Sequence, residues 1–126
     1  MSDVRIVLVT GGGSGIGRAT AKKFSEGGDH VVVADINQDG SASVVKELNS
    51  NGGDAEYVFV DVAEESSVQK MTSIVKEKWG RIDVLVNSAG ILQNVSKLGS
   101  MDLEEHDRVW AVNYRGTYLC CRSVGK

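Results

Sequence analysis

The segment from Thr10 to Gly17, which reads T-G-G-G-S-G-I-G, most limits what this chain can fold into. An apolar, β-branched run from Val4 to Thr10 precedes it, which is typical of a strand buried on both faces of a parallel sheet. Apolar residues at helical spacing follow it and end at Gly27 and Gly28. The segment is therefore a glycine-rich turn from a strand into a helix. The N-terminus of such a helix offers free N–H groups and a positive dipole end, which suit phosphate groups.

Three glycines of this turn, Gly11, Gly15 and Gly17, have the spacing G-x-x-x-G-x-G, and no register of the glycines gives G-x-G-x-x-G. We expect Gly11 to permit the tight turn, Gly15 to let a pyrophosphate approach the backbone, and Gly17 to let the helix pack close to the sheet. The other members of the expected phosphate-binding segment are Gly13, Ser14 and Ile16. A strand-to-helix turn that uses glycine without binding any ligand is the alternative interpretation of the loop alone.

The second buried strand, predicted over residues 30–35, ends in Asp35. A carboxylate about 20 residues beyond such a loop accepts hydrogen bonds from both hydroxyls of an adenosine ribose and repels a 2′-phosphate. Ile36, Asn37 and Gln38 follow, so no Lys or Arg stands beside Asp35 to bind that phosphate. The sequence therefore predicts NAD rather than NADP, with Asp35 and Ile36 among the binding residues. The alternative is that Asp35 only caps the next helix.

The rest of the chain continues the alternation of strands and helices. Further strands are predicted over 55–62 and 82–87, and helices over 41–50, over 64–79 and from 102 onward. The last helical region is expected to divide near Asn113, and Asp102 and Glu105 are arranged as a capping box at its start. This order, β-α-β-α-β-α-β-α-α, predicts one α/β domain over residues 1–126 with a parallel sheet and right-handed crossovers.

Asp61 and Asn87 close the third and fourth predicted strands. In an open parallel sheet, ligands bind at the carboxyl ends of the strands, near the point where the strand order reverses. We therefore expect the glycine loop, Asp35, Asp61 and Asn87 to line one crevice. Alternatively, Asp61 is only a turn residue, and Asn87 only bonds strand ends.

Composition excludes several other classes of function. The chain has 126 residues, of which 41% are hydrophobic and 25% charged, as in folded soluble proteins. Its net charge of −3 argues against partners such as nucleic acid or an anionic membrane surface, and no segment is long and apolar enough to span a bilayer. The adjacent Cys120 and Cys121 give neither a disulfide framework nor metal-ligand spacing. We expect no metal site and a cytoplasmic location.

With the segments Asp61-Val62 and Asn87-Ser88-Ala89-Gly90 added, the chain resembles the N-terminal half of a short-chain dehydrogenase/reductase. That family carries a T-G-x-x-x-G-x-G loop, an acidic residue after the second strand in NAD-preferring members, an Asp after the third strand, N-N-A-G after the fourth strand, and an Asn within a kinked helix. The matching residues are, in that order, Thr10, Gly11, Gly15 and Gly17, then Asp35, then Asp61, then Asn87, Ala89 and Gly90, and finally Asn113. Ser88 replaces the second Asn of the fourth-strand motif.

The resemblance implies a Rossmann-like, doubly wound parallel sheet and hydride transfer between a nicotinamide and a small carbonyl or alcohol substrate. It implies that cofactor contacts come also from Asp61, Val62, Asn87, Ala89 and Gly90, and that Asn113 supports a catalytic water relay. The family's Ser, and its Tyr-x-x-x-Lys pair in which the Lys lowers the pKa of the Tyr, are expected beyond residue 126. The domain is thus predicted to be incomplete and inactive by itself.

Three further expectations concern the C-terminal region. Tyr118 and Arg122 imitate the Tyr-x-x-x-Lys spacing, but we interpret them as a pair on a helix face. The resemblance implies that the helices after residue 102 meet a partner subunit, so a homo-oligomer is expected. The fourth strand would be left as an apolar edge. The alternatives to an oxidoreductase are a non-catalytic dinucleotide-binding module, an inactive fragment, and an oligomerisation unit with a vestigial cofactor fold.

Overall fold

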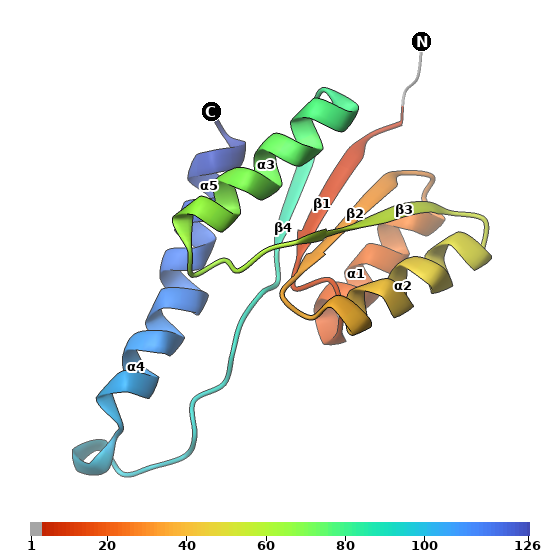
Figure 1. Ribbon diagram of the computed structural model, residues 1–126. Helices are drawn as coiled ribbons and strands as arrows, with labels where there is room; N and C mark the ends of the chain where they lie inside the picture. The colour runs from red at the N-terminus through yellow and green to blue at the C-terminus, as the bar shows by residue number, and fades with distance from the viewer. Residues whose placement is uncertain (1–3) are drawn as a thin grey trace.

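The computed structural model of the chain describes residues 4–126 and contains a sheet flanked by helices (Figure 1). In chain order the strands are β1 (Ile6–Thr10), β2 (His30–Asp35), β3 (Asp54–Phe59) and β4 (Val84–Asn87). The helices are α1 (Gly15–Glu26), α2 (Gln38–Ser50), α3 (Glu65–Trp79), the 3₁₀ turn η1 (Leu98–Ser100), α4 (Leu103–Trp110), the π turn η2 (Ala111–Arg115) and α5 (Gly116–Val124).

The sheet has the strand order β3-β2-β1-β4, and every neighbouring pair is parallel. The chain therefore builds outward from β1 to β3 and then returns to place β4 on the other side of β1. The carboxyl ends of β1 and β4, at Thr10 and Asn87, lie in register at the point where the order reverses. This arrangement confirms the predicted α/β, Rossmann-like, doubly wound sheet.

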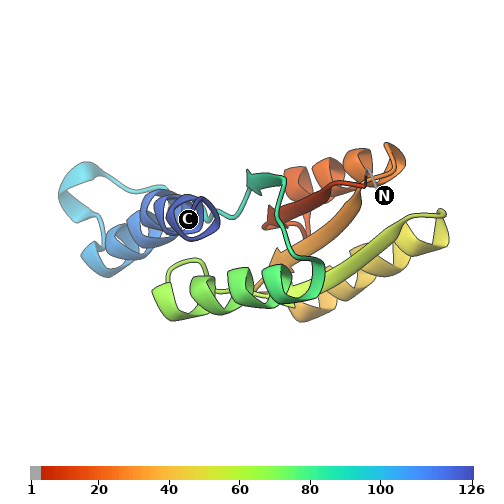
Figure 2. The same ribbon diagram turned by 90° about the horizontal axis from the view of Figure 1, so that it is seen from above.

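Helices cover both faces of the sheet because the strand residues alternate between two apolar clusters. In β1, Leu8 packs in a cluster with α3 and α5, whereas Val7 and Val9 pack in a cluster with α1 and α2. All three side chains are fully buried. Figure 2 looks nearly along α5 and shows α3 lying beside it. Burial on both faces explains why the strands read as continuous apolar runs rather than alternating ones.

Strand β2 has the predicted bounds, whereas the other three strands are shorter than predicted, and pairing explains the differences at β1 and β3. The predicted third strand reached residue 62, but β3 ends at Phe59, which is in register with Asp35, the last residue of β2. The predicted first strand began at Val4, but β1 begins at Ile6, opposite the first residue of β2, His30. Helix α2 begins three residues before the predicted position because the side chain of Asn37 accepts a hydrogen bond from the N–H of Gly40.

The C-terminal helical region divides near Asn113, as predicted, because the π turn that contains Asn113 separates α4 from α5. The residues at both junctions of the π turn keep helical backbone angles. The predicted capping box, by contrast, is incomplete. Asp102 caps α4 through the N–H of Glu104, but Glu105 accepts a hydrogen bond from the backbone N–H of Asn94 instead of closing the box. Glu105 therefore anchors the long loop before α4 rather than the helix start.

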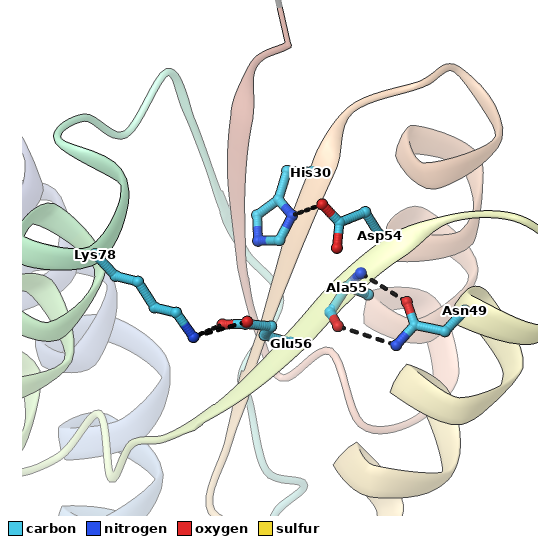
Figure 3. A network of polar contacts seen from close by, with 6 residues as sticks. All are labelled: His30, Asn49, Asp54, Ala55, Glu56 and Lys78. Carbon is cyan, nitrogen blue, oxygen red and sulfur yellow. Dashed lines mark hydrogen bonds and ion pairs between the residues drawn. The ribbon is translucent and has the colours of Figure 1, made fainter.

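A polar network ties the sheet to its helices at the amino ends of β2 and β3, away from the glycine loop (Figure 3). The side-chain amide of Asn49 bonds both the N–H and the carbonyl of Ala55, at 2.8 and 3.2 Å. His30 is buried against the Trp79 ring, with ring centroids 4.5 Å apart, and its Nδ1 lies 2.9 Å from a carboxylate oxygen of Asp54. These contacts fix β3, the edge strand, in its register.

Candidate functional site

A pocket of about 630 Å³ opens at the carboxyl ends of the strands. Four connecting segments contribute to it: the glycine loop after β1 and the segments that follow β2, β3 and β4. Residues of α4 and of the π turn complete the wall. The predicted site residues that line it are Gly11, Ser14, Gly15, Ile16, Asp35, Ile36, Asp61, Val62, Ala89 and Gly90. The structure thus brings most of the predicted residues together in one crevice.

Gly11 and Gly15 both adopt backbone angles that favour glycine, with φ of 67° and 55°. A Cβ at Gly11 would lie 2.6 Å from the Cα of Ala89, so the glycine loop packs directly on the loop after β4. A Cβ at Gly15 would meet nothing within 4 Å. Gly15 therefore presents bare backbone to the open pocket, as a bound pyrophosphate requires.

Gly17 does not line the pocket, and its role differs from the predicted one. A Cβ at Gly17 would lie 2.1 Å from the carbonyl oxygen of Gly11 and 3.1 Å from the Cα of Gly12. The close approach is thus between the first turn of α1 and the glycine loop itself, rather than between the helix and the sheet. Gly17 is what allows the loop to fold back over the helix start.

The N-terminus of α1 faces the pocket through Ser14, Gly15 and Ile16. Ser14 is the N-cap residue, but its side chain makes no capping hydrogen bond, and the first turn holds no acidic residue. Neither the N-cap side chain nor an acidic residue of the first turn therefore offsets the positive end of this helix dipole. The site therefore fits a diphosphate group.

Asp35 stands at the end of β2 with its carboxylate held in place by two backbone N–H groups. Oδ2 accepts a hydrogen bond from Gly13 and Oδ1 accepts one from Asn37, both at 3.0 Å. Gly13 does not itself line the pocket; it orients Asp35 instead. Asn37 caps α2, so helix capping by Asp35 is not the reason for the carboxylate at this place. Burial, together with the charge of Asp35, raises the pKa of the neighbouring Tyr57.

Asp61 both shapes a turn and lines the pocket. Its Oδ1 accepts a hydrogen bond from the N–H of Ala63 at 3.1 Å, and its own N–H donates to the hydroxyl of Ser67 at 2.9 Å. The two interpretations of Asp61 are therefore compatible. Asp61 and the next residue, Val62, line the same pocket as the glycine loop.

Asn87 lies behind the pocket wall rather than in it. Its Nδ2 lies 3.4 Å from the sulfur of Cys121, and its Oδ1 is buried with no partner in the part of the chain that the structure describes. Ala89 and Gly90, which follow it, do line the pocket. Of the three residues predicted here, Ala89 and Gly90 therefore line the pocket, whereas Asn87 does not.

The side chain of Asn113 is also outside the pocket. It lies on the π turn and bonds the backbone of Ile91, which is one of the lining residues. Seven lining residues were not predicted from the sequence: Val60, Ala63, Ser88, Ile91, Leu92, Arg108 and Val112. Val112 belongs to the last helical region, and no local pattern indicates which face of that region turns toward the sheet.

The structure describes residues 4–126, and within them no group of three or more His, Cys, Asp and Glu side chains could hold a metal ion. Over the same residues no helix combines the length and the apolar composition that crossing a membrane needs.

The sequence and the structure were compared with known proteins. The family model for short chain dehydrogenases matches residues 5–126. An uncharacterized oxidoreductase of Bacillus subtilis is 38% identical over 118 residues, which cover 94% of this chain and 43% of that protein. The crystal structure of gox2181 superposes with a TM-score of 0.95 and 33% identity, covering 98% of this chain and 48% of that one.

A variant of actinorhodin polyketide ketoreductase, solved with NADPH, superposes with a TM-score of 0.93 and 30% identity, over 98% of this chain and 47% of that one. The chain thus spans about half the length of the proteins it matches. The family match, the sheet order and the glycine-rich pocket agree, and the chain belongs to the short-chain dehydrogenase/reductase family of oxidoreductases.

Proposed function

We propose that this chain is the cofactor-binding half of an NAD-dependent oxidoreductase that transfers hydride between nicotinamide and a carbonyl or alcohol substrate. One observation carries the proposal. The uncapped N-terminus of α1 and the open backbone of Gly15 lie in the same pocket as the fixed carboxylate of Asp35. A helix N-terminus holds a diphosphate, and a carboxylate beside it binds a ribose with free hydroxyls.

The preference for NAD over NADP rests on charge. Asp35 places a carboxylate at the adenosine end of the pocket, and the residue beside it is the exposed, apolar Ile36. The nearest cation on the glycine-loop helix, Arg18, pairs with Glu47. A 2′-phosphate would meet the negative charge of Asp35, and the arginine that lines the pocket, Arg108, lies on α4 rather than in the segment that follows Asp35. A structural relative was solved with NADPH, so membership of the family does not decide the cofactor, and the charge of this site is the basis of the proposal.

The residues of this chain would bind and orient the cofactor. The glycine loop, with Gly11, Ser14 and Gly15, would hold the pyrophosphate, and Asp61 and Val62 would face the adenine. When bound, the nicotinamide supplies or accepts the hydride. Residues 1–126 contain no Tyr-x-x-x-Lys, so the groups that move the proton would come from outside these residues. Asn113 would contribute by holding the loop at Ile91.

We also propose a homo-oligomer that forms through the C-terminal helices, together with a cytoplasmic location. Aromatic side chains at helical spacing on α4, the π turn and α5 support the oligomer: Trp110, Tyr114 and Tyr118 are 51%, 64% and 55% exposed. Exposed aromatic residues in one row are typical of interfaces. Light scattering would give the oligomeric state of the protein, and a monomer at micromolar concentration would contradict the proposed homo-oligomer. The free cysteines, Cys120 and Cys121, support the location.

Calorimetric titration of the protein with NAD and with NADP tests the cofactor assignment. We expect NAD to bind at least about tenfold more tightly than NADP, because the 2′-phosphate meets Asp35. Equal affinities would contradict the preference, and no binding of either would contradict the cofactor site.

The second candidate, a non-catalytic dinucleotide-binding module, is favoured by Asn113, because this predicted catalytic residue bonds the backbone of Ile91 and does not line the pocket. The two functions differ in turnover. The product of the complete natural reading frame should oxidise NADH with a panel of ketones and aldehydes if it is the enzyme. NAD binding without any such oxidation would favour the module.

A further inference from the structure

The π turn between α4 and α5 is in contact with two separate segments of the pocket wall. Asn113 bonds Ile91, in the segment after β4. Arg115 donates a hydrogen bond from Nη1 to the carbonyl oxygen of Ala63, in the segment after β3, at 3.2 Å and across 52 positions of sequence. Residues two positions apart on a helix point to different sides, so one turn can reach both segments.

The segment after β3, residues 60–64, carries Asp61, Val62 and Ala63 into the pocket. Most of its hydrogen bonds are local, such as the one that the N–H of Ala63 donates to Asp61 Oδ1 and the one that the N–H of Asp61 donates to the hydroxyl of Ser67. Toward β2, the segment is held by the N–H of Val60, which donates a hydrogen bond to the backbone carbonyl oxygen of Asp35 at 3.2 Å. The bond from Arg115 holds it on the other side, at the helix.

Close packing at the next residue supports the same contact. Gly116 is buried, and a Cβ there would lie 2.8 Å from a methyl carbon of Val62 and 3.2 Å from the Val62 carbonyl oxygen. The start of α5 therefore rests directly on the segment that lines the pocket. Figure 1 shows the chain between β3 and α3 running up to the junction of α4 and α5.

We propose that Arg115 is a positioning residue for cofactor binding, which holds residues 60–64 so that Asp61 and Val62 face the adenine half of the dinucleotide. The inference rests on the proposed function, because it assumes that this pocket takes a dinucleotide. Arg115 does not line the pocket, so its effect passes through the Ala63 carbonyl. Loss of the hydrogen bond from Arg115 to Ala63 loosens residues 60–64 without altering the glycine loop.

The test replaces Arg115 in three ways and uses a matched control. Arg115→Met keeps an apolar stem and removes the donor, whereas Arg115→Lys restores a cationic donor. Arg122→Ala removes an exposed arginine of α5 that does not line the pocket. Should Arg115→Met fail to give a folded protein by circular dichroism, Arg115→Leu, which also has an apolar side chain without a donor, takes its place.

The first readout needs no cofactor. Hydrogen exchange of the backbone amides of Ala63 and Glu64 should become about tenfold faster in Arg115→Met, while exchange in the Gly15 region stays unchanged. Arg115→Lys should exchange within about threefold of the wild type, and Arg122→Ala should match it. Unchanged exchange at Ala63 and Glu64 in the variant that removes the donor overturns the inference.

The second readout is affinity for NAD and for ADP-ribose, which keeps the adenine half and the pyrophosphate but lacks the nicotinamide. We expect Arg115→Met to weaken both by the same factor, about tenfold, and Arg115→Lys to recover most of the loss. A wild-type protein that binds NAD together with an Arg115→Met variant of equal affinity would overturn the inference alone. A wild-type protein that binds no NAD would instead overturn the proposed function, whatever the exchange data show.

Discussion

The side-chain amide of Asn113 makes two hydrogen bonds of 2.9 Å with the backbone of Ile91, one accepted by Oδ1 and one donated by Nδ2. This pairing fastens the π turn to the segment after β4, which lines the pocket through Gly90, Ile91 and Leu92. A residue expected to act in a catalytic relay thus has its side chain engaged in holding a pocket wall.

We predict that Asn113→Ala lowers the free energy of unfolding by about 1–3 kcal/mol, because two hydrogen bonds to Ile91 are lost. Urea denaturation measures this change. Asn94→Ala is the matched control in the same loop, since the bond between Asn94 and Glu105 comes from the backbone N–H. Equal stabilities of the Asn113 and Asn94 variants would show that the two hydrogen bonds to Ile91 contribute nothing to the free energy of unfolding.

Gly17→Ala should disturb the glycine loop more than any neighbouring change of the same size. The added Cβ would stand 2.1 Å from the carbonyl oxygen of Gly11, so the loop or the helix start has to shift. We expect a loss of about 1–3 kcal/mol in the free energy of unfolding, together with loss of NAD binding. Gly99→Ala serves as the control, because its Cβ would meet nothing within 4 Å. An unaffected Gly17→Ala variant would contradict the observed close contact.

Asp35→Asn should reduce the preference for NAD over NADP by about tenfold or more, because the change removes a charge and keeps an acceptor for Gly13 or Asn37. The ratio of the two dissociation constants, from calorimetry, measures this. Asp39→Asn removes a carboxylate from the first turn of α2 outside the pocket and should leave the ratio unchanged. If the ratio of Asp35→Asn equals that of the wild type, Asp35 does not select the cofactor.

The stability of the fold should decrease as the pH rises from about 9 to about 11. Burial raises the pKa of the Cys120 thiol from 9.0 to about 11, so above pH 9 the unfolded chain releases this proton more readily than the folded chain. Stability from Cys120 is therefore complete below pH 9 and is lost as the pH approaches 11. Thermal unfolding of Cys120→Ala over this range should show a weaker dependence on pH, and Cys121→Ala should keep the wild-type dependence. Identical slopes in all three proteins would refute the assignment.

Local pattern was enough to predict the four parallel strands, because each is an apolar run bounded by glycine or polar residues. It also predicted that Asp35 and Asp61 lie in the pocket, since residues at the end of a parallel strand, or just after it, lie near the carboxyl edge of the sheet. The first residue of β1 and the last residue of β3 were not predicted correctly. Where β1 begins and β3 ends depends on how far β2 extends beside them, which no single strand encodes.

What only the tertiary structure decided are the contacts between residues far apart in the sequence. Gly17 packs on the glycine loop, Asn87 points behind the pocket, and Asn113 and Arg115 hold opposite segments of its wall. The reason is that a helical pattern gives spacing along one element but neither its rotation nor its neighbours. By itself, the sequence determined which edge of the sheet carries the site, whereas the packing of α4, the π turn and α5 determined how that site is held.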